Sequence, residues 1–411
     1  MPITLITPNN DGARIKVVGI GGGGGNVINT MVEKGIDGVE FIAINTDSQA
    51  LNINKADVKI QIGRSLTNGL GAGMRDDIGE KAAEESREEI QRALEGSDMI
   101  FITAGMGGGT GTGASPVIAH IAKSLNTLVV AIVTKPFKFE GKPRMELALQ
   151  GIDKLRKEVD SLIVIPNQKI LALINKDTTK KHAFELVDRV LYNATKGISQ
   201  IVTKTGEINV DFSDVKTIMQ DMGEAMIGTG IASGDNRAEK AAQDALLNPI
   251  LDEIKIKGAK CVLVNIASDG NITMSEIEKI NEIIVNEAGE DAKYIMGLVD
   301  DDILGDDLMV TLIATGFNGS AVIRKEIPLG DVKQTAINFE KPRTPMITTI
   351  SGNPEEYDTP AFKRRDIEIN NDFSEAKSSQ KSASLDDLGL DDFNVDEDYS
   401  VKPAFLRRQM D

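Results

Sequence analysis

The segment Gly105–Gly113 constrains what this chain can fold into more than any other. Six of its nine residues are glycine, and it also holds Thr110 and Thr112. It follows the apolar run Met99–Thr103 and precedes a segment with helical spacing of apolar residues, 114–125. Glycine lets the backbone come close to a bulky anion, and free NH groups at a helix start attract phosphate oxygens. A flexible linker has a similar composition, but linkers do not usually join a buried strand to an amphipathic helix. The segment therefore predicts a phosphate-binding loop.

A second glycine segment, Gly21–Asn26, follows the apolar run Ile15–Ile20 and precedes another helical pattern. Its glycines match the GxGxxG pattern of dinucleotide-binding βαβ units, in which an acidic residue follows about 20 residues later. The residues that make this match are Gly19, Gly21, Gly24 and Asp47. The pattern GxxxxGK[ST] does not occur in the chain, which excludes a P-loop nucleotide hydrolase of the usual kind.

Short apolar runs alternate with helical patterns from Ile15 to about Asn175. This alternation predicts a mostly parallel sheet with helices on both faces and a ligand at the carboxyl ends of the strands. Besides Ile15–Ile20, the expected strands are Val39–Asn45, Val58–Ile62, Asp98–Thr103, Thr127–Thr134 and Ser161–Pro166. Both glycine segments fall at that edge of the sheet.

A long helix is expected next, because apolar residues recur at helical spacing over Lys181–Val202. At ~1.5 Å per residue this helix is roughly 33 Å long. A smaller α/β domain on its far side is expected from strands at 260–267, 293–299 and 308–314 and helices at 213–222, 237–247 and 274–286. Beyond about residue 328 the periodicity ends, and the composition predicts a disordered tether. The last residues regain apolar and basic character.

Charge and composition exclude several classes of protein. A net charge of −17 argues against nucleic acid as a main partner, because phosphate backbones require a concentrated basic face. The single cysteine, Cys261, allows no disulfide within the chain and fits a reducing cytoplasm. The longest apolar stretches, such as 128–133, are far shorter than the ~20 residues of a membrane helix. Residues 1–11 lack the features of a signal peptide. We therefore expect no direct membrane insertion.

Three separated motifs together resemble the FtsZ family, the bacterial tubulin-like cell-division GTPases. They are GGGTGTG at Gly107–Gly113, GGGGN at Gly22–Asn26 and NVDFSD at Asn209–Asp214, and the resemblance runs from about Ile15 to Phe317 and returns in the last dozen residues. It implies an α/β, tubulin-like fold with a parallel-sheet nucleotide-binding domain, a long central helix and a smaller C-terminal α/β domain. The expected divisions are a flexible arm (1–13), a GTP-binding domain (14–180), the central helix (181–205), a C-terminal activation domain (206–327), a disordered linker (328–397) and a partner-binding peptide (398–411).

The resemblance implies GTP or GDP as the ligand, with magnesium held mainly through the phosphates and no dedicated metal site on the protein. The implied nucleotide-binding residues are Gly22, Gly23, Gly24, Gly25, Asn26, Ala72, Gly73, Gly107, Gly108, Gly109, Thr110, Gly111, Glu140, Arg144, Asn167, Phe184 and Asp188. Residue patterns alone leave other readings open for several of them. Glu140 and Arg144 have the i, i+4 spacing of a surface ion pair, Phe184 fits a core position, and Asp188 fits a solvated helix face. The turn around Ala72 also fits a simple helix entry.

The implied catalytic residues are Asn209, Asp211 and Asp214, in the loop after the long helix. On pattern alone, the two acids also fit helix capping, and one side chain can serve both roles. If Asp188 touches the base, most of the 23 residues between it and Asp211 are helical, which places Asp211 roughly 30 Å from the nucleotide. These acids then serve the nucleotide of a neighbouring subunit stacked head to tail, and the repeat of that contact makes a filament.

The expected function is therefore a cytoplasmic GTPase that polymerises head to tail and forms the division ring at mid-cell. One alternative is an NAD(P)-dependent oxidoreductase, which would use the GxGxxG pattern and leave the other two motifs unexplained. Another is a non-hydrolysing tubulin-like scaffold, which the intact Asn209, Asp211 and Asp214 disfavour. The resemblance also implies binding of the membrane adaptor FtsA and other division regulators by the C-terminal peptide. Tyr399–Pro403 departs from relatives that carry an acidic residue and isoleucine before the proline.

Overall fold

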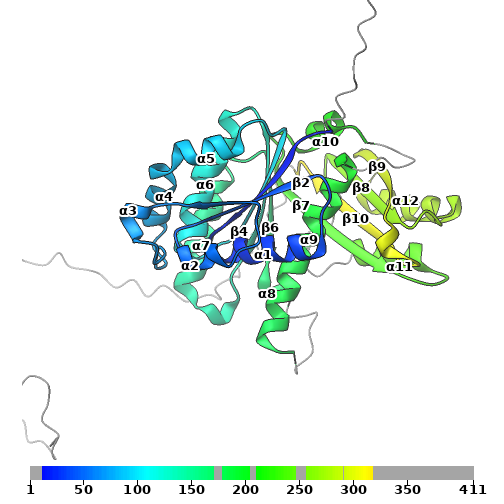
Figure 1. Ribbon diagram of the computed structural model, residues 1–411. Coiled ribbons are helices and arrows are strands. Elements are labelled where there is room, and N and C mark those ends of the chain that lie inside the picture. Colours follow the sequence, from blue (N-terminus) through cyan, green and yellow to red (C-terminus); the bar gives the residue numbers. More distant parts are fainter. Residues whose placement is uncertain (1–11, 171–177, 204–209, 247–255, 290, 318–411) are drawn as a thin grey trace, which may run out of the picture. The chain divides into compact units, whose positions relative to one another are not determined.

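The computed structural model describes residues 12–170, 178–203, 210–246, 256–289 and 291–317, all within the first of two compact units, Met1–Ile327. The predictions for Asn209, the linker 328–397 and the peptide 398–411 lie outside the described residues. Among the described residues, ten strands form one sheet in the order β3-β2-β1-β4-β5-β6-β7-β10-β8-β9. Figure 1 shows how the helices and strands of this unit are arranged. In the described part of the chain, no helix has the length and apolar character that crossing a membrane requires.

The first six strands confirm the predicted parallel sheet, because every neighbouring pair among them is parallel. They are β1 (Ile15–Ile20), β2 (Val39–Asn45), β3 (Val58–Gln61), β4 (Met99–Gly105), β5 (Leu128–Lys135) and β6 (Ser161–Pro166). Successive side chains enter two separate cores, as a sheet covered on both faces requires. Val17 and Phe101 pack in one core, and their neighbours Val18 and Ile102 pack in the other.

Helices cover both faces of this sheet. The main ones are α1 (Gly21–Lys34), α4 (Asp76–Glu85), α5 (Arg87–Leu94), α6 (Gly109–Ser124), α7 (Lys142–Leu155) and α9 (Lys180–Thr203). Apolar residues of α1 and α9 belong to the first core, and those of α4, α5, α6 and α7 belong to the second. Shorter elements are α2 (Ser48–Asn52), α3 (Arg64–Thr67), η1 (Lys138–Glu140) and α8 (Asn167–Ile170).

The last four strands continue the same sheet and add a third core. The elements are α10 (Phe212–Met219), β7 (Gly223–Ala232), α11 (Arg237–Leu246), β8 (Cys261–Ser268), α12 (Met274–Ala288), β9 (Lys293–Asp300), η3 (Asp302–Leu304) and β10 (Leu308–Thr315). A short parallel pairing joins the two sets of strands, from Ser161 opposite Gly223 to Ile163 opposite Ala225. The predicted α/β fold with a parallel sheet is thus confirmed, whereas the domain divisions proposed at residues 180 and 205 stay predictions.

Strand β7 was missing from the sequence-based prediction, and the helix expected over 213–222 ends at Met219 instead. The strand contains Gly223, Gly228 and Gly230, and glycine weakens the alternating apolar signal of a strand. The structure explains the last of these glycines, because a Cβ on Gly230 would clash with the carbonyl oxygen of Ala241 in α11. Close helix packing therefore selects glycine in a segment that pairs as a regular strand with β10.

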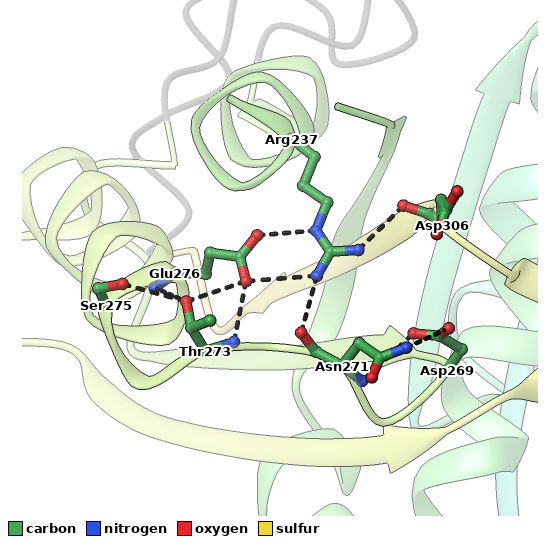
Figure 2. Close-up of polar contacts among 7 residues, drawn as sticks. All are labelled: Arg237, Asp269, Asn271, Thr273, Ser275, Glu276 and Asp306. Carbon is green, nitrogen blue, oxygen red and sulfur yellow. Dashed lines mark hydrogen bonds and ion pairs between the residues drawn. The ribbon is translucent and has the colours of Figure 1, made fainter. Parts of the chain in front are cut away.

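Arg237, at the start of α11, contacts the first turn of α12, the turn before that helix and the turn before β10 (Figure 2). Its guanidinium donates to the Glu276 carboxylate at 2.7 and 3.3 Å, to the Asn271 carbonyl at 3.1 Å and to the Asp306 carbonyl at 2.9 Å. Glu276 also accepts a hydrogen bond of 2.9 Å from the backbone NH of Thr273, the N-cap of α12. The hydrogen bond from Arg237 is the main cause that lowers the pKa of Glu276 to about 2.

Replacing Glu276 by Gln is expected to lower the free energy of unfolding by about 2 kcal/mol at pH 7, the usual worth of a charged hydrogen bond. Since the folded pKa is depressed, the stabilisation is full above pH 4.5 and disappears as the pH falls toward about 2. Urea unfolding of both proteins from pH 7 to pH 3 measures this difference. Glu282→Gln is the control, because Glu282 makes an exposed pair with Lys279 on the same helix. Equal losses of unfolding free energy in the two variants would contradict the stabilising role given to the Arg237–Glu276 hydrogen bonds.

Candidate nucleotide site

The two glycine segments meet at one edge of the sheet, but they are helix starts rather than loops. β1 and β4 are adjacent and parallel, α1 begins at Gly21 directly after β1, and α6 begins at Gly109. The expected loop over 105–113 is therefore helical over most of its length, and the glycine segment 21–26 is helical throughout. A Cβ on Gly21 would lie 3.0 Å from the backbone nitrogen of Gly111, so the first turns of α1 and α6 touch. Two sets of free NH groups and two positive dipole ends thus converge.

Several glycines here are required by contacts within the protein. A Cβ on Gly24 would clash with the carbonyl oxygen of Thr103, and a Cβ on Gly113 would clash with that of Asp76. A Cβ on Gly111 would lie 2.7 Å from the carbonyl oxygen of Gly105. Gly24 thus lets α1 pack at backbone distance from β4. Gly111 and Gly113 let α6 pack equally closely on β4 and α4.

Two other glycines have no such requirement. Apart from its neighbours along the chain and its own helix backbone, a Cβ on Gly22 or Gly108 would meet no atom of the described residues within 4 Å. Neither residue has the left-handed backbone that favours glycine, and Gly108 has φ −93° and ψ 175°, which any residue can adopt. The space beside these two positions lies at the helix starts, where free backbone NH groups suit an anion. We therefore read Gly22 and Gly108 as glycines that leave room for a ligand.

The two threonines of the nine-residue segment have different surroundings. The Thr112 hydroxyl is buried and accepts a hydrogen bond of 2.8 Å from the backbone NH of Gly107, so it fastens the segment to α6. The Thr110 hydroxyl lies 2.7 Å from that of Thr46, in the turn between β2 and α2. Thr46 was not among the predicted site residues, because an isolated threonine after a strand carries no sequence signal.

The third glycine-rich turn packs against the start of α6. Leu70 forms a bridge with Asp47, and the backbone NH of Ser48 donates to the Gly69 carbonyl at 3.1 Å. A Cβ on Gly109 would lie 2.8 Å from the Cβ of Ala72. Ala72 and Gly73 therefore belong to the same edge as the two helix starts.

Glu140 and Arg144 form the predicted ion pair, with 3.1 Å between Oε2 and Nη1. The pair is tied to the site, because a Cβ on Gly107 would lie 2.7 Å from the carbonyl oxygen of Arg144. Glu140 Oε1 accepts a hydrogen bond of 2.8 Å from the backbone NH of Phe137. The buried Nε of Arg144 has no hydrogen-bond partner in the described part of the chain. The Arg144 side chain as a whole is 41% exposed, so a ligand can still reach its guanidinium.

An aromatic and amide wall continues the site toward α9. The Phe184 ring packs edge to face on Phe137 with 5.4 Å between centroids, and 36% of Phe184 is exposed. Asn167 directly follows β6 and is 5% exposed, and its Oδ1 has no partner among the described residues. Asp188 lies one turn beyond Phe184 and is partly buried rather than fully solvated. Burial first, and then the charge of Glu185, raise the pKa of Asp188 to about 6.

Asp211 and Asp214 lie at the opposite edge of the sheet. Asp211 is the N-cap of α10, and its Oδ1 accepts a hydrogen bond of 2.8 Å from the backbone NH of Asp214, which confirms the capping role. The end of α10 sits at the amino end of β6, where the Ser161 hydroxyl donates to the Met219 carbonyl at 2.6 Å. The glycine segments follow the carboxyl ends of parallel strands in the same sheet. The structure thus separates the acids from the other described site residues.

Within the described residues, no group of three or more His, Cys, Asp or Glu side chains is placed to hold a metal ion.

Comparisons with known proteins point to one family. Residues 14–175 match the family model of the tubulin/FtsZ GTPase domain, and residues 223–318 match that of the FtsZ C-terminal domain. The chain is 49% identical over 329 residues to the cell division protein FtsZ of Coxiella burnetii (strain RSA 493 / Nine Mile phase I), which covers 80% of this chain and 85% of that protein. An empty FtsZ dimer from M. jannaschii is 44% identical with a TM-score of 0.72, over 75% of this chain and 89% of that one. CetZ2 from Haloferax volcanii, in a GTPγS-bound protofilament, is 20% identical and shares the fold with a TM-score of 0.63, over 75% and 94% of the two chains.

Proposed function

The chain belongs to the FtsZ family of tubulin-like cell-division GTPases, and we propose from this premise that it binds GTP at the carboxyl edge of its sheet. Bound GTP drives head-to-tail assembly into the filaments of the bacterial division ring, and hydrolysis at the subunit junctions drives turnover. The main support for this binding site is the open space at Gly22 and Gly108, between two converging helix starts.

The phosphates take hydrogen bonds from the backbone NH groups of Gly22–Asn26 and Gly107–Gly111, since both segments open helices. Ala72 and Gly73 lie against α6 and face the γ-phosphate. Glu140 and Arg144 bind the ribose and phosphate side, while Asn167, Phe184 and Asp188 surround the base. Magnesium, bound mainly through the phosphate oxygens, supplies charge neutralisation.

Catalysis in trans follows from the positions of the acids. Asp188 lies in the first half of α9, and the 15 residues from Asp188 to the helix end at Thr203 span roughly 23 Å at ~1.5 Å per residue, which separates Asp188 from the segment that leads to Asp211. Asp211 and Asp214 therefore do not reach the nucleotide of their own subunit. Stacking of a second subunit brings them over the neighbour's open nucleotide, where they orient and polarise the attacking water. The contact joins two different faces, so it repeats into a filament.

The NAD(P)-dependent alternative is disfavoured by the same structure. The acidic residue of a dinucleotide fold hydrogen-bonds a ribose hydroxyl. Asp47 instead caps α2, because its Oδ1 accepts from the backbone NH of Gln49 at 2.9 Å and of Ala50 at 3.2 Å. Gly19 and Gly24 serve strand–helix contact, since a Cβ on Gly19 would lie 2.5 Å from the Gly24 carbonyl oxygen.

Light scattering with different nucleotides tests the proposed function. GTP with magnesium is expected to raise the scattering, which then decays as GTP is consumed, while ATP and NADH cause no rise. A rise that needs no hydrolysis and never decays would favour the scaffold, and binding of NADH would favour the oxidoreductase.

Guanine recognition by Asp188 predicts that GTP affinity depends on pH. The ionised carboxylate accepts two hydrogen bonds from guanine N1 and N2, and protonation removes that capacity. With a pKa of about 6, the ionised fraction falls about tenfold from pH 7 to pH 5, and the affinity should fall equally. Equilibrium titration across this range measures the effect, with Asp188→Asn as control for titration of the phosphates. The same dependence of GTP affinity on pH in both proteins would show that Asp188 does not bind guanine.

We further propose that the C-terminal peptide 398–411 binds a membrane adaptor such as FtsA, and other division regulators, and so places the filaments at mid-cell in the cytoplasm. Its apolar Phe405 and Leu406 and basic Arg407 and Arg408 suit a partner groove with acidic rims. Deleting Ala404–Asp411 should abolish adaptor binding in a pull-down and leave GTP hydrolysis and light scattering unchanged. Loss of assembly in the truncated protein would place this segment in the folded body instead.

A further inference from the structure

We propose that Thr46 is a positioning residue for the nucleotide: its buried hydroxyl orients the Thr110 hydroxyl so that Thr110 donates its proton to a phosphate oxygen. This inference rests on the proposed GTP site and adds to it a residue that acts through another side chain. Thr46 comes from the turn between β2 and α2, and Thr110 lies in the first turn of α6.

The direction of the hydrogen bond follows from burial. The two Oγ1 atoms are 2.7 Å apart, and Thr46 is 0% exposed. A hydroxyl has one proton to donate. Thr46 Oγ1 makes no second hydrogen bond with any residue that the structure describes. If Thr110 were the donor, the Thr46 proton would be buried without an acceptor, which is unfavourable. Thr46 is therefore the donor, and the Thr110 proton stays available.

The available proton lies at the proposed phosphate site. Thr110 is 8% exposed and is the second residue of α6, next to the open space at Gly108. The other hydroxyl of the segment, on Thr112, accepts a hydrogen bond from the backbone NH of Gly107. The Thr46 backbone is itself anchored, since the Thr67 hydroxyl lies 3.3 Å from the Thr46 carbonyl oxygen and 3.0 Å from that of Gly63. Thr46 thus holds a fixed position from which it orients Thr110.

Thr46→Val tests this role, because valine keeps the shape of threonine and removes the donor. We expect GTP and GDP affinity to fall about tenfold, the loss of one hydrogen bond to a charged group. Thr46→Ser retains the hydroxyl and should bind within about twofold of the wild type. Thr127→Val is the matched control, since it removes a buried threonine hydroxyl that donates to the Ser97 carbonyl at 3.1 Å and contacts neither Thr46 nor Thr110. Fluorescence titration measures affinity, and thermal unfolding without nucleotide shows that each variant is folded.

A double substitution separates positioning from general damage. In a Thr110→Val background, Thr46→Val should cause no further loss of affinity, because the hydroxyl on which it acts is gone. Equal binding by Thr46→Val and Thr127→Val, or an undiminished loss in the Thr110→Val background, would overturn the proposal. If Thr46→Val does not fold, Thr46→Ala takes its place in the same comparisons. Absence of GTP binding in the wild type would instead refute the proposed function.

Discussion

Replacing Gly108 by valine is expected to weaken GTP binding at least 100-fold while the protein stays folded. A Cβ at this position meets no atom of the part of the chain that the structure describes within 4 Å, its chain neighbours aside, and the backbone angles of Gly108 suit a β-branched residue. The added methyl groups would occupy the space of the phosphates and block the NH groups at the start of α6. Equilibrium titration with GTP measures the affinity, and urea unfolding measures the stability.

Gly24→Ala is the matched control for this result. Its Cβ would clash with the Thr103 carbonyl oxygen, so we expect a loss of stability of about 2 kcal/mol or more. Gly108→Val should therefore abolish GTP binding without a loss of stability. Gly24→Ala should lower the urea concentration at which the protein unfolds. Normal GTP affinity in Gly108→Val would show that the open space is not the phosphate site.

Replacing Asp211 by asparagine is expected to slow GTP hydrolysis about 100- to 1,000-fold, the usual contribution of a residue that activates a nucleophile. Asparagine caps a helix as well as aspartate does, so α10 keeps its N-cap and the fold keeps its stability. GTP affinity and assembly should be unchanged, because the binding residues lie at the other edge of the sheet. Phosphate release at saturating GTP measures the rate. A near-normal rate would leave Asp211 with its capping role alone.

Much of the fold could be predicted because buried parallel strands appear in the sequence as apolar runs. The predicted bounds of β1, β2 and β6 are those observed, and the long helix differs from α9 by one residue at each end. Strand β7 could not be predicted, since one of its glycines, Gly230, is required by contact with Ala241 of α11, and this contact arises only when the helix packs back on the strand.

The candidate site was predictable as a set of glycines, but the separate roles of those glycines were not. Gly22 and Gly24 belong to one unbroken run, yet one leaves room for a ligand and the other permits contact with Thr103. The two glycines differ only because β4 packs against Gly24 and not against Gly22 in the folded structure. Likewise, Asp188 reads as a solvated helix residue, and its raised pKa arises from burial that the fold imposes. The pairing of Thr46 with Thr110 depends on a contact across 64 residues.

The shared active site is tested most directly by mixing two variants that fail for opposite reasons. Asp211→Asn is expected to bind GTP and to lack one of the proposed catalytic acids, whereas Gly108→Val is expected to keep both acids and to lose GTP binding. In a mixed filament, the second variant supplies Asp211 and Asp214 to the nucleotide of the first across a junction. Steady-state phosphate release per bound GTP should then rise above the rate of Asp211→Asn alone as the share of Gly108→Val increases. Co-sedimentation shows that mixed filaments form. If they form and the rate never exceeds that of Asp211→Asn alone, the active site is not completed by the neighbouring subunit.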